Sequence, residues 1–394
     1  MFGSRYLLAA VLLGETDGIR TELVRTDDRW TAQASPCLEN SIYDGEVRDF
    51  TAARLGKGCR CVVTDTAYRP VPEDDAPIRE RAVLHPTLYI SPKGEQILDF
   101  GQNMVGFVRF GMTLKKGTRV TLSHGEVLQK DCFYNANLRT ARAQAVYVSD
   151  GQYRVYEPMF TYFGFRYVLV EGLETVDPAD FCGVVLSSDL RTVLSCETDH
   201  PKINRLISNT VWGQRGNFLD VPTDCPQRDE RLGWTADTQV FSRTACYQMD
   251  CYPFYRKYLK DLRADQTLHY GGDFPMYSPS LRGEAGNGGA VWADCGTILP
   301  WNLYEFYGDR ELLEESYPMM RDYAELLLRR DAEQGGRHLI LYGFTFGDWL
   351  AQDGVCAQSL AGGTDTGYIM SVYYYHSIRL TAYAAEALGL SRDA

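Results

Sequence analysis

At 394 residues the chain exceeds the usual size of one domain, and a hydrophobic content of 45% supports two or three separate cores, which excludes a largely disordered chain. A formal net charge of −12 argues against a nucleic-acid partner, whose phosphates require a clustered basic surface. The sequence contains no apolar run of about 18 residues, so we expect no membrane span. The eleven cysteines lack metal-ligand spacing, so we expect reduced thiols, no metal and no cofactor.

The first 85 residues combine short apolar stretches with clusters of Gly, Asp and Pro, which predicts an N-terminal β-sandwich domain over 1–85. The run from Tyr6 to Gly14 is short and lacks a small-residue cleavage site, so it predicts a buried strand rather than a signal peptide. Without a signal peptide we expect a cytoplasmic protein. Export remains an alternative if a signal precedes Met1.

The strand pattern becomes more regular between residues 86 and 190. Alternating apolar residues follow one another with short turns, as in Leu88–Ser91 and the Pro92–Gly94 turn that comes after it. The pattern closes near Phe165–Val170. These features predict a second antiparallel β-sandwich over 86–190.

From residue 191 the hydrophobic period becomes that of helices, which predicts an all-α domain over 191–394. Apolar residues recur at helical spacing in five windows: 203–211, 255–262, 298–307, 312–328 and 369–388. Loops rich in glycine and aromatic residues separate them, notably 271–275 and 342–349. We therefore expect the functional residues on connecting loops.

The most polar segment of the chain, Asp220 to Asp237, lies between two helical patterns. It holds five carboxylates, two arginines and one tryptophan in eighteen residues. If a helix runs from Glu230 onward, Trp234 at i+4 and Asp237 at i+7 share its face, which suits a polar, ring-shaped ligand. A structural alternative is a helix start with Asp224 as the N-cap.

This segment resembles the signature of the bacterial α-L-rhamnosidases of glycoside hydrolase family 78. Further similarity, to the accessory β-domains of that family, lies in Ser41–Glu46, Asp99–Asn103 and Phe163–Tyr167. The resemblance implies two antiparallel β-sandwich, jelly-roll-like domains followed by part of an all-α (α/α)6 toroid. It also implies an inverting hydrolase that releases terminal α-L-rhamnose, with rhamnose-containing glycosides or oligosaccharides as its partners.

The resemblance assigns the general acid to Glu230, which would protonate the leaving oxygen. Asp229 and Arg231 beside it are expected to have structural roles in a first helical turn. Carboxylates, guanidinium groups and indole rings suit sugar hydroxyls and ring faces. We expect the following side chains to contact the sugar, the first four by match to the family and the others from their place on loops: Asp224, Arg228, Trp234, Asp237, Trp292, Asp294, Asp348 and Trp349. For Trp292 and Trp349 a core position is an equal alternative.

The resemblance places the general base on a late barrel loop beyond Ala394, and no residue of this chain matches it. We therefore expect a fragment, truncated at the C-terminus and at the N-terminus too. Losing the base should lower the rate by a factor of about 10² to 10⁴, and uncovered apolar helix faces should favour self-association. Three alternatives remain open: another inverting glycosidase on the same toroid, a non-catalytic carbohydrate-binding protein, and a structural assembly module.

Overall fold

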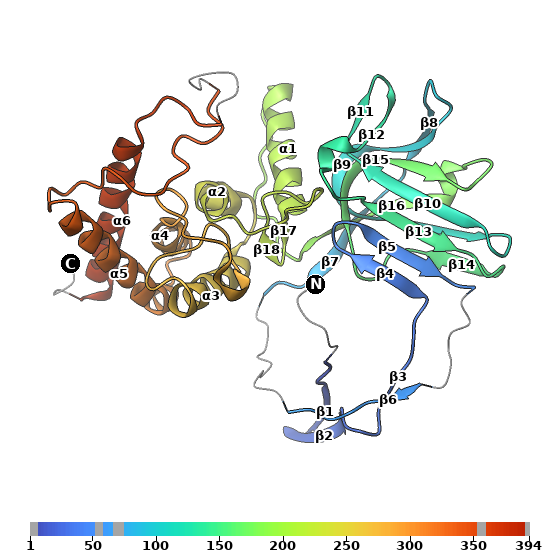
Figure 1. The fold of residues 1–394 in the computed structure, drawn as a ribbon, viewed down its shortest axis with the longest axis horizontal. Coiled ribbons are helices and arrows are strands. Elements are labelled where there is room, and N and C mark those ends of the chain that lie inside the picture. Colours follow the sequence, from blue (N-terminus) through green and yellow to red (C-terminus); the bar gives the residue numbers. More distant parts are fainter. Residues whose placement is uncertain (1–6, 52–57, 66–74, 353–359, 391–394) are drawn as a thin grey trace.

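A β-rich part and a helical part lie side by side in the computed structural model, which describes residues 7–51, 58–65, 75–352 and 360–390 (Figure 1). Helix α1 (Pro201–Asn217) lies between them, against strands of the β-rich part (Figure 1). No helix in these ranges is both long and apolar enough to cross a membrane. The chain thus follows the predicted order of β-structure before helices.

One ten-stranded sheet dominates the β-rich part, with neighbours in the order β4-β5-β13-β10-β15-β9-β16-β7 and with β8 and β14 also paired to β9. In chain order its strands are β4 (Cys37–Ser41), β5 (Gly45–Asp49), β7 (Ile78–Leu84), β8 (Thr87–Ile90), β9 (Gln96–Thr113), β10 (Arg119–Gly125), β13 (Gln144–Val148), β14 (Tyr153–Tyr156), β15 (Phe163–Glu171) and β16 (Phe181–Ser188). A small hairpin of β11 (Val127–Gln129) and β12 (Cys132–Tyr134) stands beside the sheet.

The long strand β9 links two groups of strands in this sheet, because its first half pairs with β15 and its second half pairs with β16. Gly106 lies where the pairing changes, with φ at 151°, and a Cβ there would come within 1.8 Å of the Val184 carbonyl oxygen. Only glycine permits so close an approach. Aromatic rings fill the core, where Phe110 stacks on Tyr156 and Phe181 at centroid distances of 4.8 and 5.0 Å.

The sheet crosses the division predicted at residue 85. Strand β5 runs parallel to β13, and β7 pairs antiparallel with β16, so strands from 1–85 and 86–190 share one sheet. The reason is that pairing between strands far apart in sequence leaves no mark in the local alternation of residues. The remaining N-terminal strands form two small sheets: β1 (Val11–Thr16) with β2 (Ile19–Arg25), and β3 (Thr31–Ala32) with β6 (Cys59–Arg60).

The predicted buried strand at Tyr6 to Gly14 is wrong in its burial. Strand β1 begins at Val11, and Leu12 and Leu13 are 58% and 52% exposed. Its hairpin partner β2 covers the edge of β1, and in the described residues no second layer covers its faces. Tyr6 itself lies outside the described residues.

Six helices make up the described helical part and confirm the predicted helical windows. After α1 they are α2 (Thr235–Gln248), α3 (Tyr252–Leu268), α4 (Cys295–Tyr307), α5 (Arg310–Glu333) and α6 (Thr366–Leu388). Gly308 ends α4 in a left-handed conformation, and the Asp309 carboxylate then accepts bonds from the first amides of α5. Asp365 caps α6 in the same way. The described chain also has short 3₁₀ helices at η1 (Ala136–Leu138), η2 (Pro178–Asp180) and η3 (Leu281–Gly283). Two short strands, β17 (Phe218–Leu219) and β18 (Val221–Pro222), pair with each other just after α1.

The helical core forms where α3, α4 and α5 meet. Phe254 and Tyr258 of α3 are fully buried there, together with Leu299 of α4 and Met319 and Tyr323 of α5. Burying each such side chain contributes about 1.5–3 kcal/mol. This core fixes the ends of the helices, and therefore the loops between them, relative to the β-rich part.

Candidate active site

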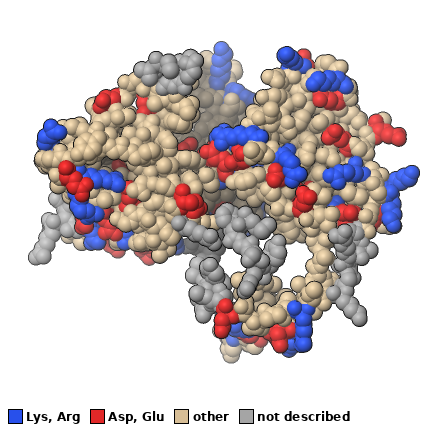
Figure 2. Space-filling model, in the orientation of Figure 1, with Lys and Arg blue, Asp and Glu red and all other residues tan. Residues whose placement is uncertain are grey.

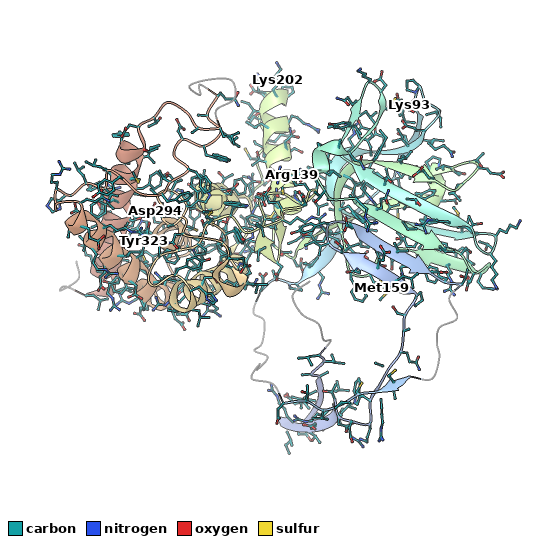
Figure 3. The ribbon with its side chains drawn as sticks, viewed as in Figure 1. Lys93, Arg139, Met159, Lys202, Asp294 and Tyr323 are labelled. Carbon is teal, nitrogen blue, oxygen red and sulfur yellow. The ribbon has the colours of Figure 1, made fainter. Side chains whose placement is uncertain are left out.

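The segment that joins α1 to α2 lies at the junction of the two parts, and we call residues 220–234 the acid loop. On the face shown in Figure 2, acidic and basic side chains adjoin one another at this junction. Figure 3 likewise places Arg139, from the β-rich part, at the junction. Charged groups from both parts therefore meet around the acid loop.

The acid loop is not helical, so the predicted helix from Glu230 onward is wrong. Helix α2 begins at Thr235, with Trp234 as its N-cap, and Asp224 caps no helix. The Asp224 carboxylate instead accepts a hydrogen bond from the Leu232 amide at 3.0 Å and so closes the loop on itself. Arg231 has a φ of 55°, which interrupts a right-handed helix at that point.

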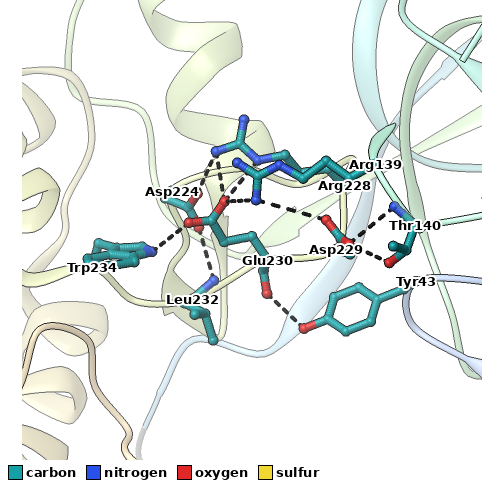
Figure 4. A network of polar contacts seen from close by, with 9 residues as sticks. All are labelled: Tyr43, Arg139, Thr140, Asp224, Arg228, Asp229, Glu230, Leu232 and Trp234. Carbon is teal, nitrogen blue, oxygen red and sulfur yellow. Dashed lines mark hydrogen bonds and ion pairs between the residues drawn. The ribbon is translucent and has the colours of Figure 1, made fainter. Parts of the chain in front are cut away.

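The Glu230 side chain is nonetheless brought to Trp234, by a hydrogen bond rather than by helical spacing (Figure 4). Its Oε1 accepts a bond from Trp234 Nε1 at 3.1 Å, and its Oε2 accepts bonds from Arg228 Nε and Arg139 Nη1, each at 2.9 Å. The side chain is 17% exposed. Charge-assisted bonds of this kind are stronger than neutral ones and fix the direction of the carboxyl group.

The neighbours of Glu230 are tied to the β-rich part. The Tyr43 hydroxyl donates to the Glu230 carbonyl oxygen at 2.8 Å, and the Thr140 amide and hydroxyl both donate to Asp229 Oδ2. These bonds from Thr140, together with Arg139, lower the pKa of Asp229. These contacts are consistent with the structural role expected of Asp229. They link it to Thr140 of the β-rich part rather than to a neighbour in a helical turn.

Arg231 anchors the acid loop more deeply. It is 5% exposed, and its guanidinium group lies 4.7 Å from the ring centroid of Tyr162 and 5.8 Å from that of Tyr43. Nη1 donates to the Tyr162 carbonyl oxygen at 3.0 Å. Burial lowers the pKa of Arg231, because removing a charged guanidinium group from water is unfavourable. The two rings and the carbonyl group offset part of this cost.

Asp224 lines two hollows that flank the acid loop. One, of about 400 Å³, also contains Asp237 in its wall; the other, of about 700 Å³, runs between β9 and α1 and reaches Arg228. Burial raises the pKa of Asp224, and the nearby Glu230 carboxylate adds to the rise. Loss of hydration also raises the pKa of Asp237, which faces Asp224 and Glu230 although part of it is exposed.

A second loop, residues 342–350, brings aromatic rings to the other side of Trp234, and we call it the aromatic loop. Phe346 is its centre: the ring centroids of Trp292, Trp349 and Trp234 lie 4.6, 5.4 and 6.1 Å from it. Trp292 is 6% exposed and Trp349 is 42% exposed. Three predicted tryptophans therefore gather around Phe346, which was not predicted. Its place two residues before Asp348 in a glycine-rich loop was the available signal.

Among the described contacts, neither Asp294 nor Asp348 bonds to the Glu230 carboxyl group. Asp294 is 1% exposed within the helical part (Figure 3), where it accepts bonds from the Ser377 hydroxyl at 2.5 Å and the Val291 amide at 2.8 Å. Burial raises the pKa of Asp294 to about 6. Asp348 accepts a bond from the Thr364 hydroxyl at 2.8 Å. These contacts serve the packing of α4, α6 and the aromatic loop.

The acid loop also contains three groups of metal-ligand type, since ligand atoms of Asp224, Cys225 and Glu230 lie within 4.8 Å of one another. Two guanidinium groups already supply positive charge there, from Arg228 and Arg139. Burial raises the pKa of the Cys225 thiol to about 12, so the thiol stays protonated at neutral pH. The donor set therefore suits hydrogen bonding better than a cation.

Comparison with known proteins identifies relatives for both parts. Residues 191–394 match the bacterial alpha-L-rhamnosidase 6 hairpin glycosidase domain, and residues 90–187 match the bacterial alpha-L-rhamnosidase concanavalin-like domain. The chain is 37% identical to an alpha-L-rhamnosidase of Streptomyces avermitilis, over 98% of this chain and 38% of that protein.

Two solved structures have the same fold over almost the whole chain. The alpha-L-rhamnosidase of Streptomyces avermitilis complexed with L-rhamnose has a TM-score of 0.86 at 36% identity, covering 97% of this chain and 37% of that one. The native enzyme from Aspergillus terreus has a TM-score of 0.88 at 31% identity, covering 98% and 46%. The chain thus spans about two fifths of the length of the relatives it matches.

Proposed function

This chain belongs to the bacterial α-L-rhamnosidase family, and we propose that the protein hydrolyses terminal α-L-rhamnosides with Glu230 as the general acid. One observation carries the proposal: Arg228 and Trp234 orient the Glu230 carboxyl group, the Asp224 carboxylate lies within 4.8 Å of it, and aromatic rings pack around Trp234. Hydroxyl-binding groups, a flat apolar surface and a directed carboxyl group are what sugar hydrolysis requires.

In the proposed reaction Glu230 gives its proton to the oxygen that links the rhamnose to its leaving group. The bond between that oxygen and the anomeric carbon breaks, and its electron pair stays with the oxygen. Water adds to the opposite face of the sugar and loses a proton to a second carboxylate, as in inverting enzymes. The products are free rhamnose and the protonated leaving group, and we assign the second carboxylate to no residue of this chain.

Around this reaction the other side chains bind and orient the sugar. The carboxylates of Asp224 and Asp237 face the hollow beside the acid loop and accept bonds from sugar hydroxyls. Trp234 and Trp349 offer apolar ring surfaces, of which Trp349 is the more open, whereas Trp292 is 6% exposed and packs behind them against Phe346. These groups suit a neutral sugar, and the similarity to α-L-rhamnosidases supports rhamnose as its terminal unit.

The test is hydrolysis by the full-length protein of a panel of 4-nitrophenyl glycosides that includes α-L-rhamnoside, α-L-fucoside and α-glucoside. We expect turnover of the rhamnoside and, for Glu230→Gln, a loss of about 10² to 10⁴ in kcat, the usual contribution of a general acid. Glu174→Gln, an exposed residue of the β-rich part, is the matched control. Faster cleavage of another sugar would contradict the assigned substrate, and full activity of Glu230→Gln would contradict the assigned acid.

A further inference from the structure

Arg139 reaches the Glu230 carboxyl group from the β-rich part, 91 residues earlier in the chain. It follows turn η1 with φ at 61° and ψ at −117°, a conformation that a residue with a side chain seldom adopts. Such a conformation persists only where surrounding contacts hold it. Here the contacts are the ion pair of Arg139 with Glu230 and the bonds from the next residue, Thr140, to Asp229.

The two oxygens of Glu230 have unequal surroundings. Oε2 lies 2.9 Å from Nε and Nη2 of Arg228 and 2.9 Å from Nη1 of Arg139, whereas Oε1 accepts only the Trp234 indole N–H among the described contacts. A carboxylate oxygen has about two lone-pair sites. Donors therefore fill Oε2, and Oε1 keeps room for a proton.

We infer that Arg139 is a positioning residue that, together with Arg228, occupies Oε2 of Glu230 and so holds the transferable proton on Oε1. This inference rests on the proposed function. It makes the β-rich part a contributor to the reaction, because the sheet supplies one of the two guanidinium groups that turn the acid. Arg139 acts through Glu230, and we assign it no contact with the substrate.

The partial exposure of Arg139 decides how large its effect should be. Its side chain is 54% exposed, so solvent screens the pair and its share of the stability is small. The direction of the carboxyl group is more sensitive, because proton transfer depends on hydrogen-bond geometry. We therefore expect loss of Arg139 to affect proton donation more than folding.

Arg142→Ala provides a matched control, because Arg142 lies with Arg139 in the segment between β12 and β13. The Arg142 side chain is 59% exposed and pairs with Glu39 and Asp44 rather than with Glu230. The full-length protein and the variants Arg139→Ala, Arg139→Lys and Arg142→Ala would be compared on two substrates, methyl α-L-rhamnoside and 2,4-dinitrophenyl α-L-rhamnoside. The methoxide leaving group needs a proton from the acid, whereas dinitrophenolate leaves without one.

For Arg139→Ala we expect kcat on the methyl rhamnoside to fall about tenfold and kcat on the dinitrophenyl rhamnoside to change by less than about twofold, since only the first depends on general acid catalysis. KM should stay close to that of the unmodified protein. Arg139→Lys should recover most of the loss, and Arg142→Ala should show none. Equal losses on both substrates, no loss on either, or the same loss in Arg142→Ala would overturn the inference.

A second measurement tests the pairing without turnover. The thermal midpoints of Arg139→Ala, Glu230→Gln and the double variant should be non-additive, because either single change already removes the Arg139–Glu230 ion pair and the double variant cannot lose it again. Additive midpoints in an active protein would overturn this inference and leave the proposed function standing. If the unmodified protein cleaves no rhamnoside, the proposed function fails and the inference fails with it.

Discussion

The acid loop and the aromatic loop meet where Trp234 contacts Phe346, but they are held in different ways. Directional hydrogen bonds from charged and hydroxyl groups of the β-rich part fix the acid loop: Tyr43 binds the Glu230 carbonyl, Arg139 its carboxyl, and Thr140 the adjacent carboxylate. Ring contacts centred on Phe346 assemble the aromatic loop, and several of its side chains remain exposed.

The difference matches what each loop is proposed to do. A group that transfers a proton must be placed at the level of single atoms, which hydrogen bonds achieve. A surface for the face of a sugar ring needs area and a suitable angle, which packed aromatic rings supply. Changes in the acid loop should therefore act on kcat, and changes in the aromatic loop on KM.

The largest expected effect comes from breaking the deepest anchor of the acid loop. Arg231→Ala removes the contacts with the Tyr43 and Tyr162 rings and the bond to the Tyr162 carbonyl. We expect the free energy of unfolding to fall by about 2–3 kcal/mol and kcat to fall with it, as measured by urea denaturation and rhamnoside hydrolysis. Arg191→Ala, at an exposed arginine paired with Asp250, is the control. Unchanged stability and kcat would show that this anchor does not hold the loop.

A smaller effect, confined to substrate binding, is expected on the aromatic side. Phe346→Ala removes the ring that Trp234, Trp292 and Trp349 share, and loss of such ring contacts costs about 0.5–1.5 kcal/mol per pair. KM for an aryl rhamnoside should rise about tenfold while kcat changes little. Tyr153→Ala, with an exposed side chain on β14 in the β-rich part, should leave both constants unchanged. A fall in kcat at constant KM would contradict the division of labour between the loops.

The smallest effect on activity is expected at Asp294, which contacts neither the Glu230 carboxyl group nor the Phe346 ring among the described contacts. Its folded-state pKa of about 6 is above the ordinary value, so its contribution to stability is full below about pH 4 and is lost as pH rises through about 6. The loss amounts to about 3 kcal/mol for a shift of about two units.

Asp294→Asn should remove this decline, so the stability of the variant relative to the parent should rise between pH 4 and pH 7 while KM stays constant. Urea denaturation at several pH values measures it, with the exposed Asp199→Asn as the control. The same pH dependence in parent and variant would show that the Asp294 carboxyl does not titrate as described.

Local sequence patterns predicted much of the fold. The helical windows appear as α1 and α3 to α6 because a period of 3.6 residues is a local signal. Local patterns did not indicate that β5 and β7 pair with strands about 100 residues further along the chain, because sheet pairing of this kind has no local signature.

The candidate site divides in a similar way. Asp224, Arg228, Glu230 and Trp234 were predicted together and do meet, although through a non-helical loop that Arg231 interrupts. Arg139 was missed because it reaches the site from a segment 91 residues away. Phe346 was missed because the loop pattern around residues 342–349 does not show which of its rings contacts Trp234. Short spacing thus identified the chemistry, whereas the groups that orient it required the tertiary structure.

The role of Glu230 as the proton donor can be tested by a crystal structure of the full-length protein with a rhamnoside whose bridging atom is sulfur. We expect Glu230 Oε1 within about 2.6–3.2 Å of that atom, or slightly further for sulfur, with Oε2 still held by Arg228 and Arg139. We also expect the sugar ring to contact Trp234 or Trp349. A rhamnoside bound with its bridging atom away from Glu230, or facing Oε2, would show that Glu230 is not the proton donor.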